Sequence, residues 1–484
     1  MASSINYLLQ SGRLEQVFID GQWHTIDTGN YLAVINPATE TVIGQLALCN
    51  TVHVNLAVAA AKKAFISWSQ TLVSERIALL TKIHQLLLER AEIFAQALSL
   101  EMGAAINYAR TAQVPLAAEH VRVAIENLSN YQFLTYRNAS VIVREPIGVC
   151  GLITPWNWPL YQITAKVAPA LAAGCTVVLK PSEQSPLSAY LFAELMQDAG
   201  TPAGVFNLLN GDGGGVGAPL SEHSDVDMIS ITGSTRAGVQ VAQAAAPTVK
   251  RIAQELGGKS PNIILPDADL EKAIAPGVSA CFRNVGQSCS APTRMIVPRN
   301  KLAEVEQLSI GAISDIQMGN PEEEHNTHGP LSNGAQFERV QSLIQIGIDE
   351  GAKLITGGVG RPKGLETGFY VKPTIFSDVT SKMRIAQEEI FGPVLVIIPY
   401  DSVEEAITIA NDTIYGLGAH IQGSDMDVVK KVASTIRSGQ VHLNYPAWDP
   451  YAPFGGYKSS GTGREFGIEG LEEYLETKAI IGFI

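Results

Sequence analysis

Residues 149–180 read VCGLITPWNWPLYQITAKVAPALAAGCTVVLK. Two short apolar runs, at 149–153 and 176–179, flank a longer segment at 159–173 that has the length of a helix. A strand, a helix and a strand in this order form a βαβ unit, and such units place their strands side by side in a parallel sheet. The stretch therefore predicts an α/β fold.

The same alternation continues along the chain. Further strands are expected at 205–208, 228–231 and 263–265, separated by helical segments at 185–199, 213–222 and 234–246. A second alternating block follows at 270–437, so the pattern predicts two α/β units in one chain.

The two ends of the chain depart from this pattern. Short strands with turns and then two amphipathic helices are expected at 17–45, 55–68 and 74–102. Ser74 is a simple cap candidate, because Ile77 stands where a capping box needs Glu or Gln. The last residues, 480–484, are apolar, and we expect them to dock against another element or another subunit.

The composition excludes several classes of protein. The chain has 484 residues, 46% of them hydrophobic, which is ample for a large core and argues against disorder. Its 47 acidic and 34 basic residues give a net charge of −13 without any Lys/Arg-rich run, so we expect no nucleic-acid partner. Charged residues make up 17%, below the usual value of about 25%, which indicates surface hidden in subunit contacts.

Cysteine usage favours a reducing compartment. The five cysteines are scattered without a C-x-x-C pair, which argues against a disulfide or zinc framework. The N-terminal residues lack a basic region before an apolar one, so we expect no secretory signal. A long uncharged run at 146–165 contains three prolines, and we expect no membrane partner. The sequence thus predicts a cytoplasmic protein.

Two glycine-containing turns follow predicted strands. One includes Gly213 and Gly217; in the other, Gly233 precedes a helix that would begin at Ser234 and direct free N–H groups at an anion. Neither has the G-x-G-x-x-G spacing, and taken alone each is better interpreted as an ordinary βα turn. His325 lies in an acidic loop without a set of ligands at metal-binding spacing, so we expect no metal site.

Cys289 is the strongest candidate nucleophile. It lies in the segment Gly286-Gln-Ser-Cys-Ser, a small and polar surround in which a thiolate would be accessible. From the residues alone, a structural role is an equal alternative. A cysteine hydrolase would need a histidine base, and the sequence places none; a serine hydrolase would need a G-x-S-x-G motif, which is absent.

Seven motifs, together and in order, resemble those of the NAD(P)-dependent aldehyde dehydrogenase superfamily. They are TPWNWP at 154–159, KPSE at 180–183, TGST at 232–235, ELGGKS at 255–260, GQSC at 286–289, EIFGP at 389–393 and PFGGYKSSG at 453–461. One departure is Ile231, which precedes TGST where Phe is common in the family. The resemblance extends over residues 18–480.

The resemblance implies oxidation of an aldehyde to a carboxylic acid. Cys289 would attack the aldehyde carbon, and the side-chain amide of Asn157 with the backbone N–H of Cys289 would stabilise the oxyanion. Glu255 would activate the water that hydrolyses the resulting thioester, and we expect partial burial to raise its pKa. Lys166 and Glu476 would assist a proton relay.

The resemblance also implies NAD as cofactor, with NADP as the less favoured alternative. Lys180 and Glu183 would hold the adenosine ribose, where a carboxylate accepts hydrogen bonds from the hydroxyls and repels a 2′-phosphate. Glu389 would hold the nicotinamide ribose, and Phe391 would pack against the ring. The expected set is Ile153, Thr154, Pro155, Trp156, Lys180, Ser182, Glu183, Gly213, Gly217, Gly233, Ser234, Leu256, Glu389 and Phe391.

The implied fold is a Rossmann-type cofactor domain, an α/β catalytic domain and a small β arm that joins subunits. In this chain the NAD-binding domain would comprise 1–131 and 145–255, and the catalytic domain 256–445. The oligomerisation arm would comprise 132–144 and 470–484, and a homodimer or homotetramer is expected.

Other functions stay open on the sequence alone. Acyl transfer to coenzyme A would replace water by a thiol, and Glu255 argues for water. A non-catalytic relative is disfavoured because Cys289, Asn157 and Glu255 are all present, and a thiol hydrolase is the most remote alternative.

The substrate is expected to be a small-molecule aldehyde. Ser288 and the 445–451 loop would line the entrance, where Tyr445 and Trp448 favour an apolar or aromatic aldehyde. No basic residue is obviously placed for an anionic tail, which argues weakly against semialdehydes. Trp158 is either a wall of the reaction centre or part of the core.

Overall fold

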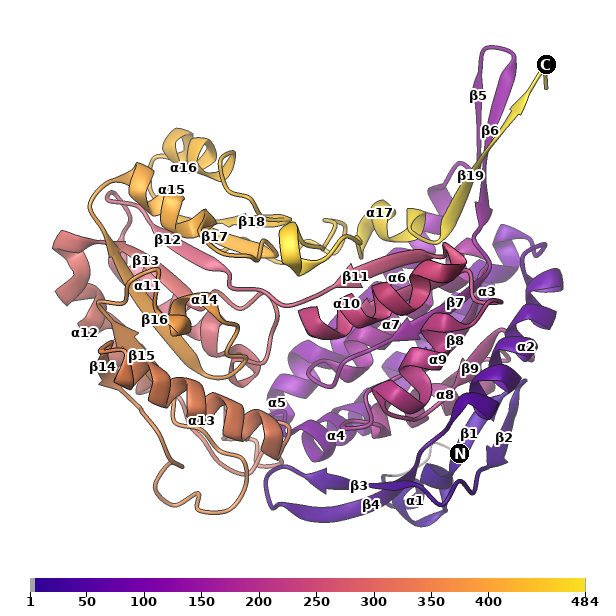
Figure 1. Cartoon of the computed structure of the whole chain (residues 1–484), viewed down its shortest axis with the longest axis horizontal. Coiled ribbons are helices and arrows are strands. Elements are labelled where there is room, and N and C mark those ends of the chain that lie inside the picture. The colour runs from indigo at the N-terminus through magenta and orange to yellow at the C-terminus, as the bar shows by residue number, and fades with distance from the viewer. Residues whose placement is uncertain (1–4, 484) are drawn as a thin grey trace.

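Two seven-stranded sheets organise residues 5–483, the part of the chain that the computed structural model describes (Figure 1). The first sheet contains β1 (Gln16–Ile19), β2 (Gln22–Thr25), β7 (Val149–Ile153), β8 (Thr176–Lys180), β9 (Phe206–Leu208), β10 (Met228–Thr232) and β11 (Arg251–Glu255). Its order is β11-β10-β7-β8-β9-β1-β2. The strands from β7 to β11 are parallel, which confirms the predicted βαβ units, and β1 and β2 extend the sheet antiparallel.

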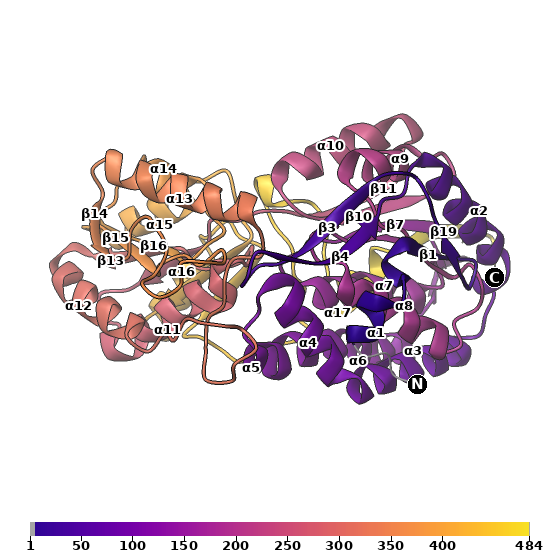
Figure 2. The same cartoon turned by 90° about the horizontal axis from the view of Figure 1, so that it is seen from below.

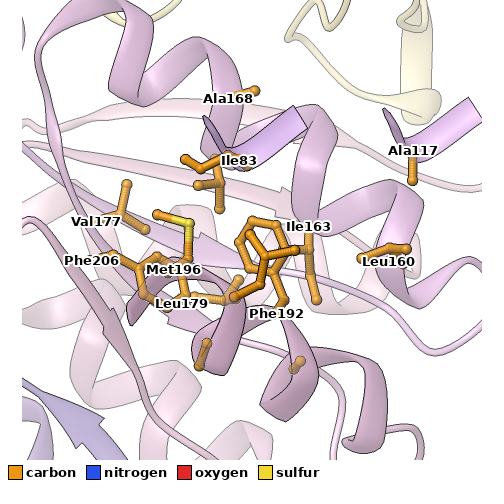
Figure 3. Close-up of a cluster of buried hydrophobic side chains, with 14 of the residues drawn as sticks. Ile83, Ala117, Leu160, Ile163, Ala168, Val177, Leu179, Phe192, Met196 and Phe206 are labelled. Carbon is orange, nitrogen blue, oxygen red and sulfur yellow. The ribbon is translucent and has the colours of Figure 1, made fainter. Parts of the chain in front are cut away.

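Helices cover both faces of this sheet. They are α2 (Thr51–Trp68), α3 (Val73–Glu89), α4 (Ala91–Met102), α6 (Val114–Asn130), α7 (Pro159–Ala173), α8 (Leu187–Asp198), α9 (Ala218–Glu222) and α10 (Thr235–Ala245). Successive residues of β7 point to opposite faces, so Cys150 and Leu152 join a core with α3, α4, α6, α7 and α8. Val149 and Ile153 join the other core, with α2, α9 and α10. Figure 3 shows part of the first core, where α7 and α8 meet β8 and β9.

The second sheet has the same sandwich arrangement. Its strands are β12 (Pro261–Ile264), β13 (Arg294–Pro298), β14 (Lys353–Thr356), β15 (Thr374–Ser377), β16 (Val394–Tyr400), β17 (Gly418–Gln422) and β18 (Gln440–Leu443). Their order is β14-β15-β16-β13-β12-β17-β18. One face carries α11 (Leu270–Phe282) and α12 (Leu302–Ile313), and the other carries α13 (Gly334–Asp349), α15 (Val403–Asn411) and α16 (Met426–Ala433).

A hairpin links the two halves of the molecule. β3 (Tyr31–Asn36) and β4 (Thr41–Ala47) pair with each other and reach from the first half to a loop of the second (Figure 2). There the Phe369 N–H donates to the Pro37 oxygen at 3.0 Å, and Arg361 pairs with Glu40 at 3.0 Å. Short helices complete the elements: α1 (Ile5–Gln10), α5 (Ile106–Tyr108), α14 (Arg384–Gln387) and α17 (Gly467–Glu472).

A three-stranded antiparallel sheet projects from the first half as an arm (Figure 1). It consists of β5 (Leu134–Arg137), β6 (Ser140–Pro146) and β19 (Leu475–Ile481) in the order β19-β6-β5. The arm begins later than the expected residue 470, because α17 precedes it and Leu471 packs in the core. Its apolar end is exposed, with Ile481 85% and Phe483 54% accessible. Residues 1–4 and 484, which the expected domain limits include, lie outside the described residues.

Local structure corrects the expected N-terminal helices. The single helix expected at 74–102 is two helices, because Arg90 leaves helical geometry (φ −107°, ψ 15°) and pairs with Asp198 at 2.5 Å. Ser74 is not the cap; α3 begins one residue earlier, where the Glu75 carboxylate accepts from the Leu72 N–H at 2.7 Å. Within residues 5–483 no helix is both long and apolar enough to cross a membrane.

Candidate active site

A cavity of about 460 Å³ lies where loops of the two sheets meet. It adjoins the carboxyl ends of β7, β10 and β11, and β7 is the strand at which the chain reverses its direction of travel across the sheet. Open α/β sheets bind ligands at such a point. The lining consists of Pro155, Trp156, Asn157, Gln162, Thr232, Gly233, Ser234, Thr235, Arg236, Leu256, Gly257, Cys289, Gln336, Arg339, Glu389, Phe391 and Tyr415.

Cys289 lies in this cavity, on the loop between α11 and β13, with a half-buried free thiol. The loop packs closely against the ELGGKS segment, since a Cβ on Gly258 would lie 2.3 Å from the Cys289 oxygen. Burial, and after it the charges of Glu389 and Glu255, raises the pKa of the Cys289 thiol well above its ordinary value. The thiol is therefore protonated at neutral pH and needs a base before it can act as a nucleophile.

Asn157 meets the cysteine loop from the first sheet. It lies in the turn between β7 and α7, and its Nδ2 donates to the backbone oxygen of Gln287 at 2.9 Å. Asn284 fixes the same turn, because its Nδ2 donates to the backbone oxygens of Asn157 at 2.9 Å and Gln287 at 3.2 Å. An amide nitrogen has two N–H groups, so one of those on Asn157 is free to serve a ligand in the cavity that Cys289 also lines.

Glu255 is a buried carboxyl group at the end of β11. The residue is 2% exposed, and neither carboxylate oxygen has a hydrogen-bond partner among residues 5–483. Burial first, and then Glu465, raises the pKa of Glu255 well above its ordinary value, against the lowering by Lys166 and Arg464. The direction agrees with the expected rise in pKa, and a raised pKa makes the carboxylate a stronger base.

Known proteins are similar to this chain in sequence and in fold. The model of the aldehyde dehydrogenase family matches residues 23–480. The chain belongs to the aldehyde dehydrogenase family. It is therefore an oxidoreductase that acts on aldehydes, and the predicted fold class is confirmed.

Individual relatives align over nearly their full length. Aldehyde dehydrogenase C of Pseudomonas syringae, solved as a mutant with NAD+ and octanal, is 62% identical, with a TM-score of 0.98 and coverage of 100% of this chain and 99% of that chain. The 3-succinoylsemialdehyde-pyridine dehydrogenase of Pseudomonas sp. is 53% identical, covering 97% of this chain and 98% of that protein. An aldehyde dehydrogenase of Bacillus cereus, solved with NAD+, is 39% identical, with a TM-score of 0.92 and coverage of 96% of both chains.

A buried ion pair lies next to Glu255 in this aldehyde dehydrogenase. Lys166 of α7 is fully buried, and its Nζ donates to Oε1 of Glu465 at 2.5 Å. The structure places Glu476, which was expected to assist a proton relay, away from this ion pair. Because β19 carries Glu476 out along the arm, its side chain is exposed and pairs with Arg251 at 2.8 Å.

Seven of the fourteen expected cofactor residues line the cavity. They are Pro155, Trp156, Gly233, Ser234, Leu256, Glu389 and Phe391. The other seven lie outside that lining, at the carboxyl ends of β7 and β8 and in the π-helical turn Gly213–Gly217: Ile153, Thr154, Lys180, Ser182, Glu183, Gly213 and Gly217. Within this group Lys180 pairs with Glu183 at 3.2 Å, which joins the two ends of the KPSE segment.

Glu389 and Phe391 form one wall of the cavity. Oε1 of Glu389 accepts from the Gly258 N–H at 3.0 Å, and burial raises the pKa of Glu389 to about 7. Phe391 has a positive φ of 62°, and its ring stands edge-on to Trp156 with centroids 5.4 Å apart. Strained backbone of this kind is found where surrounding structure holds a residue for binding.

Aromatic side chains lie beside the cysteine loop. Trp158 donates from Nε1 to the Ser288 hydroxyl at 3.0 Å, and its ring lies 5.3 Å from that of Tyr161 and 5.9 Å from that of Tyr108. Trp158 therefore contacts the residue that immediately precedes Cys289. These rings form an aromatic cluster beside the cysteine loop.

The 445–451 loop has one aromatic side chain that is packed and one that is exposed. The Tyr445 hydroxyl accepts from Asn262 at 2.9 Å and donates to the Ala273 oxygen at 2.7 Å, so this side chain packs against the second sheet. Trp448 is 41% exposed, and its ring lies 6.0 Å from that of His120. Of the two residues, Trp448 is the more exposed.

Sequence reasoning missed several residues of the site. Glu465 follows the PFGGYKSSG motif closely, but nothing in its spacing marks it among neighbouring glutamates. Ser230 accepts a hydrogen bond from Lys166 at 2.9 Å, although it stands in an apolar strand. Arg236 and Arg339 line the cavity. The position of Arg236 directly after TGST is a signal that could have identified it.

Proposed function

We propose that this aldehyde dehydrogenase uses NAD to oxidise a small aldehyde to a carboxylate, through a thioester on Cys289 that water hydrolyses. The observation that carries the proposal is one cavity lined by both Cys289 and Asn157, and by Leu256, which directly follows the buried Glu255. Incubation with aldehyde and NAD tests it. NADH formation without coenzyme A supports it; NADH only with coenzyme A would assign acyl transfer instead.

The residues around the cavity fit NAD. Ser234 caps α10, whose free N–H groups suit a pyrophosphate. The hydroxyls of Thr154 and Thr232 are buried at the ends of β7 and β10 and have no hydrogen-bond partner in the described part of the chain. Glu183 would hold the adenosine ribose and Glu389 the nicotinamide ribose. When bound, NAD supplies the acceptor for the hydride that leaves the substrate carbon.

Cys289 and Asn157 carry the first half of the reaction. The Cys289 thiol first gives its proton to solvent water; Sγ then bonds to the aldehyde carbon, and an electron pair of the C=O bond moves to oxygen. The free N–H of Asn157 and the backbone N–H of Cys289 donate to that oxygen, and they stabilise its charge without adding a titrating group. After loss of hydride, the acyl group is held on Sγ as a thioester.

Glu255 carries the second half. Its carboxylate takes a proton from water, the water oxygen bonds to the thioester carbon, and the C–S bond breaks to release the acid and the Cys289 thiolate. The neighbouring Lys166 and Glu465, joined at 2.5 Å, provide a buried route by which that proton leaves the base.

The substrate is an apolar aldehyde. The rings of Trp158 and Tyr161 beside the cysteine loop support this, and a relative at 62% identity was solved with octanal. A second candidate is an aldehyde with an aromatic ring, because another relative is named for 3-succinoylsemialdehyde-pyridine. Comparison of kcat/KM for octanal, a pyridine-bearing aldehyde and a charged semialdehyde decides between them.

The arm joins copies of the chain into a homodimer or homotetramer. Large apolar side chains are exposed along it, namely Leu134, Tyr136, Ile480, Ile481 and Phe483. The enzyme acts in the cytoplasm, for which its five free cysteines give support. Light scattering of the full chain tests the assembly, and a monomer would reject it.

A further inference from the structure

One serine interrupts the apolar interior of the first sheet. Ser230 lies in β10 and is 2% exposed. Ile229 and Ile231 point to the core under α2, α9 and α10, so Ser230 shares the opposite face with Met228, towards α7. A hydroxyl in such a core is costly unless it is hydrogen-bonded.

The partner of Ser230 is the ammonium group next to the proposed base. Lys166 donates from Nζ to the Ser230 hydroxyl at 2.9 Å and to Glu465 at 2.5 Å. An ammonium group has three donors on a flexible stem, and two fixed acceptors restrict where it lies. Ser230 thus contacts the Lys166 ammonium group from the sheet, and Glu465 contacts the same group from its loop.

Tyr474 lies next to Ser230 at the base of the arm. Its side chain is buried beside the serine, and its backbone oxygen accepts from the Ile147 N–H at 3.0 Å and the Cys175 thiol at 3.3 Å. Tyr474 immediately precedes β19. The chain of contacts therefore runs from the arm through Ser230 to Lys166.

We propose that Ser230 is a positioning residue that holds the Lys166 ammonium against Glu465, with the Tyr474 ring packed beside the serine, so that the charge around Glu255 favours hydrolysis of the thioester. The inference rests on the proposed role of Glu255. It concerns the second half of the reaction only, because Ser230 makes no described contact with Cys289 or Asn157.

The physical basis is the balance of charge around Glu255. Four charged groups change the pKa of Glu255, namely Glu465, Glu473, Lys166 and Arg464. Glu255 in turn changes the pKa of Cys289. Without the serine hydroxyl, Lys166 loses one of its two acceptors and its ammonium is held less firmly. The lowering that Lys166 exerts on the pKa of Glu255 then weakens, so more of the base is protonated at a given pH.

The test compares Ser230→Ala and Ser230→Thr with the wild-type enzyme. First-turnover NADH formation is measured by rapid mixing, and decay of the acyl enzyme by rapid-quench mass spectrometry across pH. In Ser230→Ala we expect NADH formation within about twofold of wild type and hydrolysis about tenfold slower, the effect of one hydrogen bond to a charged group. The pH below which hydrolysis slows, the acid limb of the profile, moves upward in Ser230→Ala. In Ser230→Thr it returns to the wild-type position.

A control variant and a second test variant complete the experiment. Ser309→Ala removes a buried hydroxyl on α12 without a hydrogen-bond partner in residues 5–483, and it should leave both rates unchanged. Tyr474→Phe retains the ring and should shift the acid limb in the same direction by less than Ser230→Ala. Should Ser230→Ala not fold, an unshifted limb in Tyr474→Phe overturns the proposal.

Failure of this inference is distinct from failure of the proposed function. Unchanged hydrolysis in Ser230→Ala, equal losses of both rates, or no rescue by Ser230→Thr overturns the role of Ser230. In each of these cases Glu255→Gln, measured beside it, still stops hydrolysis after one turnover. Normal hydrolysis in Glu255→Gln would instead overturn the proposed base and the inference with it.

Discussion

The side-chain amide of Asn157 donates to the backbone oxygen of Gln287 at 2.9 Å. This bond joins the turn after β7, in the first sheet, to the loop of the second half that carries the nucleophile. The hydrogen bond therefore fixes the proposed oxyanion donor relative to the loop that carries the thiol. Rigid placement of this kind is what makes a hydrogen-bond donor effective on a developing charge.

Replacement of Asn157 by Ala should lower kcat by about 10²- to 10³-fold, the usual cost of one oxyanion donor. Asn157→Asp should be at least as impaired, because a carboxylate repels the developing oxyanion. Steady-state kinetics with octanal measure the loss, and thermal unfolding checks that the fold is retained. A kcat within threefold of wild type would assign the oxyanion to other donors.

Replacement of Cys289 by Ala should lower NADH production by at least about 10³-fold, because the thioester can no longer form. NAD affinity, measured by calorimetry, should stay within threefold. Cys281→Ala is the matched control, since that thiol is fully buried among core residues of the second sheet. Turnover retained in the Cys289 variant would point to another nucleophile.

Hydrolysis of the thioester should depend on pH through Glu255. The pKa of Glu255 is raised above its ordinary value of 4.5, mainly by burial, so the carboxylate that accepts a proton is present only at higher pH. The rate should therefore rise with pH through the raised pKa and fall as acid protonates the group. Rapid-quench assays should show this limb in wild type and its absence in Glu255→Gln. An acid limb at 4.5 or below would contradict the assignment.

Replacement of Glu183 by Gln should increase kcat/KM for NADP relative to NAD by about tenfold, because one negative charge near a 2′-phosphate is removed. The amide still accepts a hydrogen bond, so NAD should remain a good cofactor. Cofactor titrations and kinetics with both dinucleotides give the ratio. An unchanged ratio would place the adenosine ribose away from Glu183.

The strands and helices around the site follow from local sequence. Helix α7 has the predicted bounds, and strands β8, β9 and β10 agree within one residue, because short buried apolar runs bounded by turns permit few alternatives. The break at Arg90 could not be predicted, since the sequence around it contains neither Gly nor Pro.

Site residues that belong to recognisable motifs could be predicted from the sequence. Site residues that only tertiary contacts bring into place could not. Cys289 and Asn157 come together as their motifs predict. Glu465 is one of five glutamates between 465 and 476, and their spacing does not show which of them meets Lys166. Ser230 likewise resembles any other residue of a strand until its partner is known.

The central claim is that an acyl group on Cys289 is released by water that Glu255 activates. Intact-protein mass spectrometry of Glu255→Gln, incubated with NAD and octanal, tests it most directly. The account predicts one octanoyl group per chain, mapped to the peptide that contains Cys289 and absent when Cys289 is also replaced by Ala. Steady NADH formation at the wild-type rate, without any acylated Cys289, would contradict it.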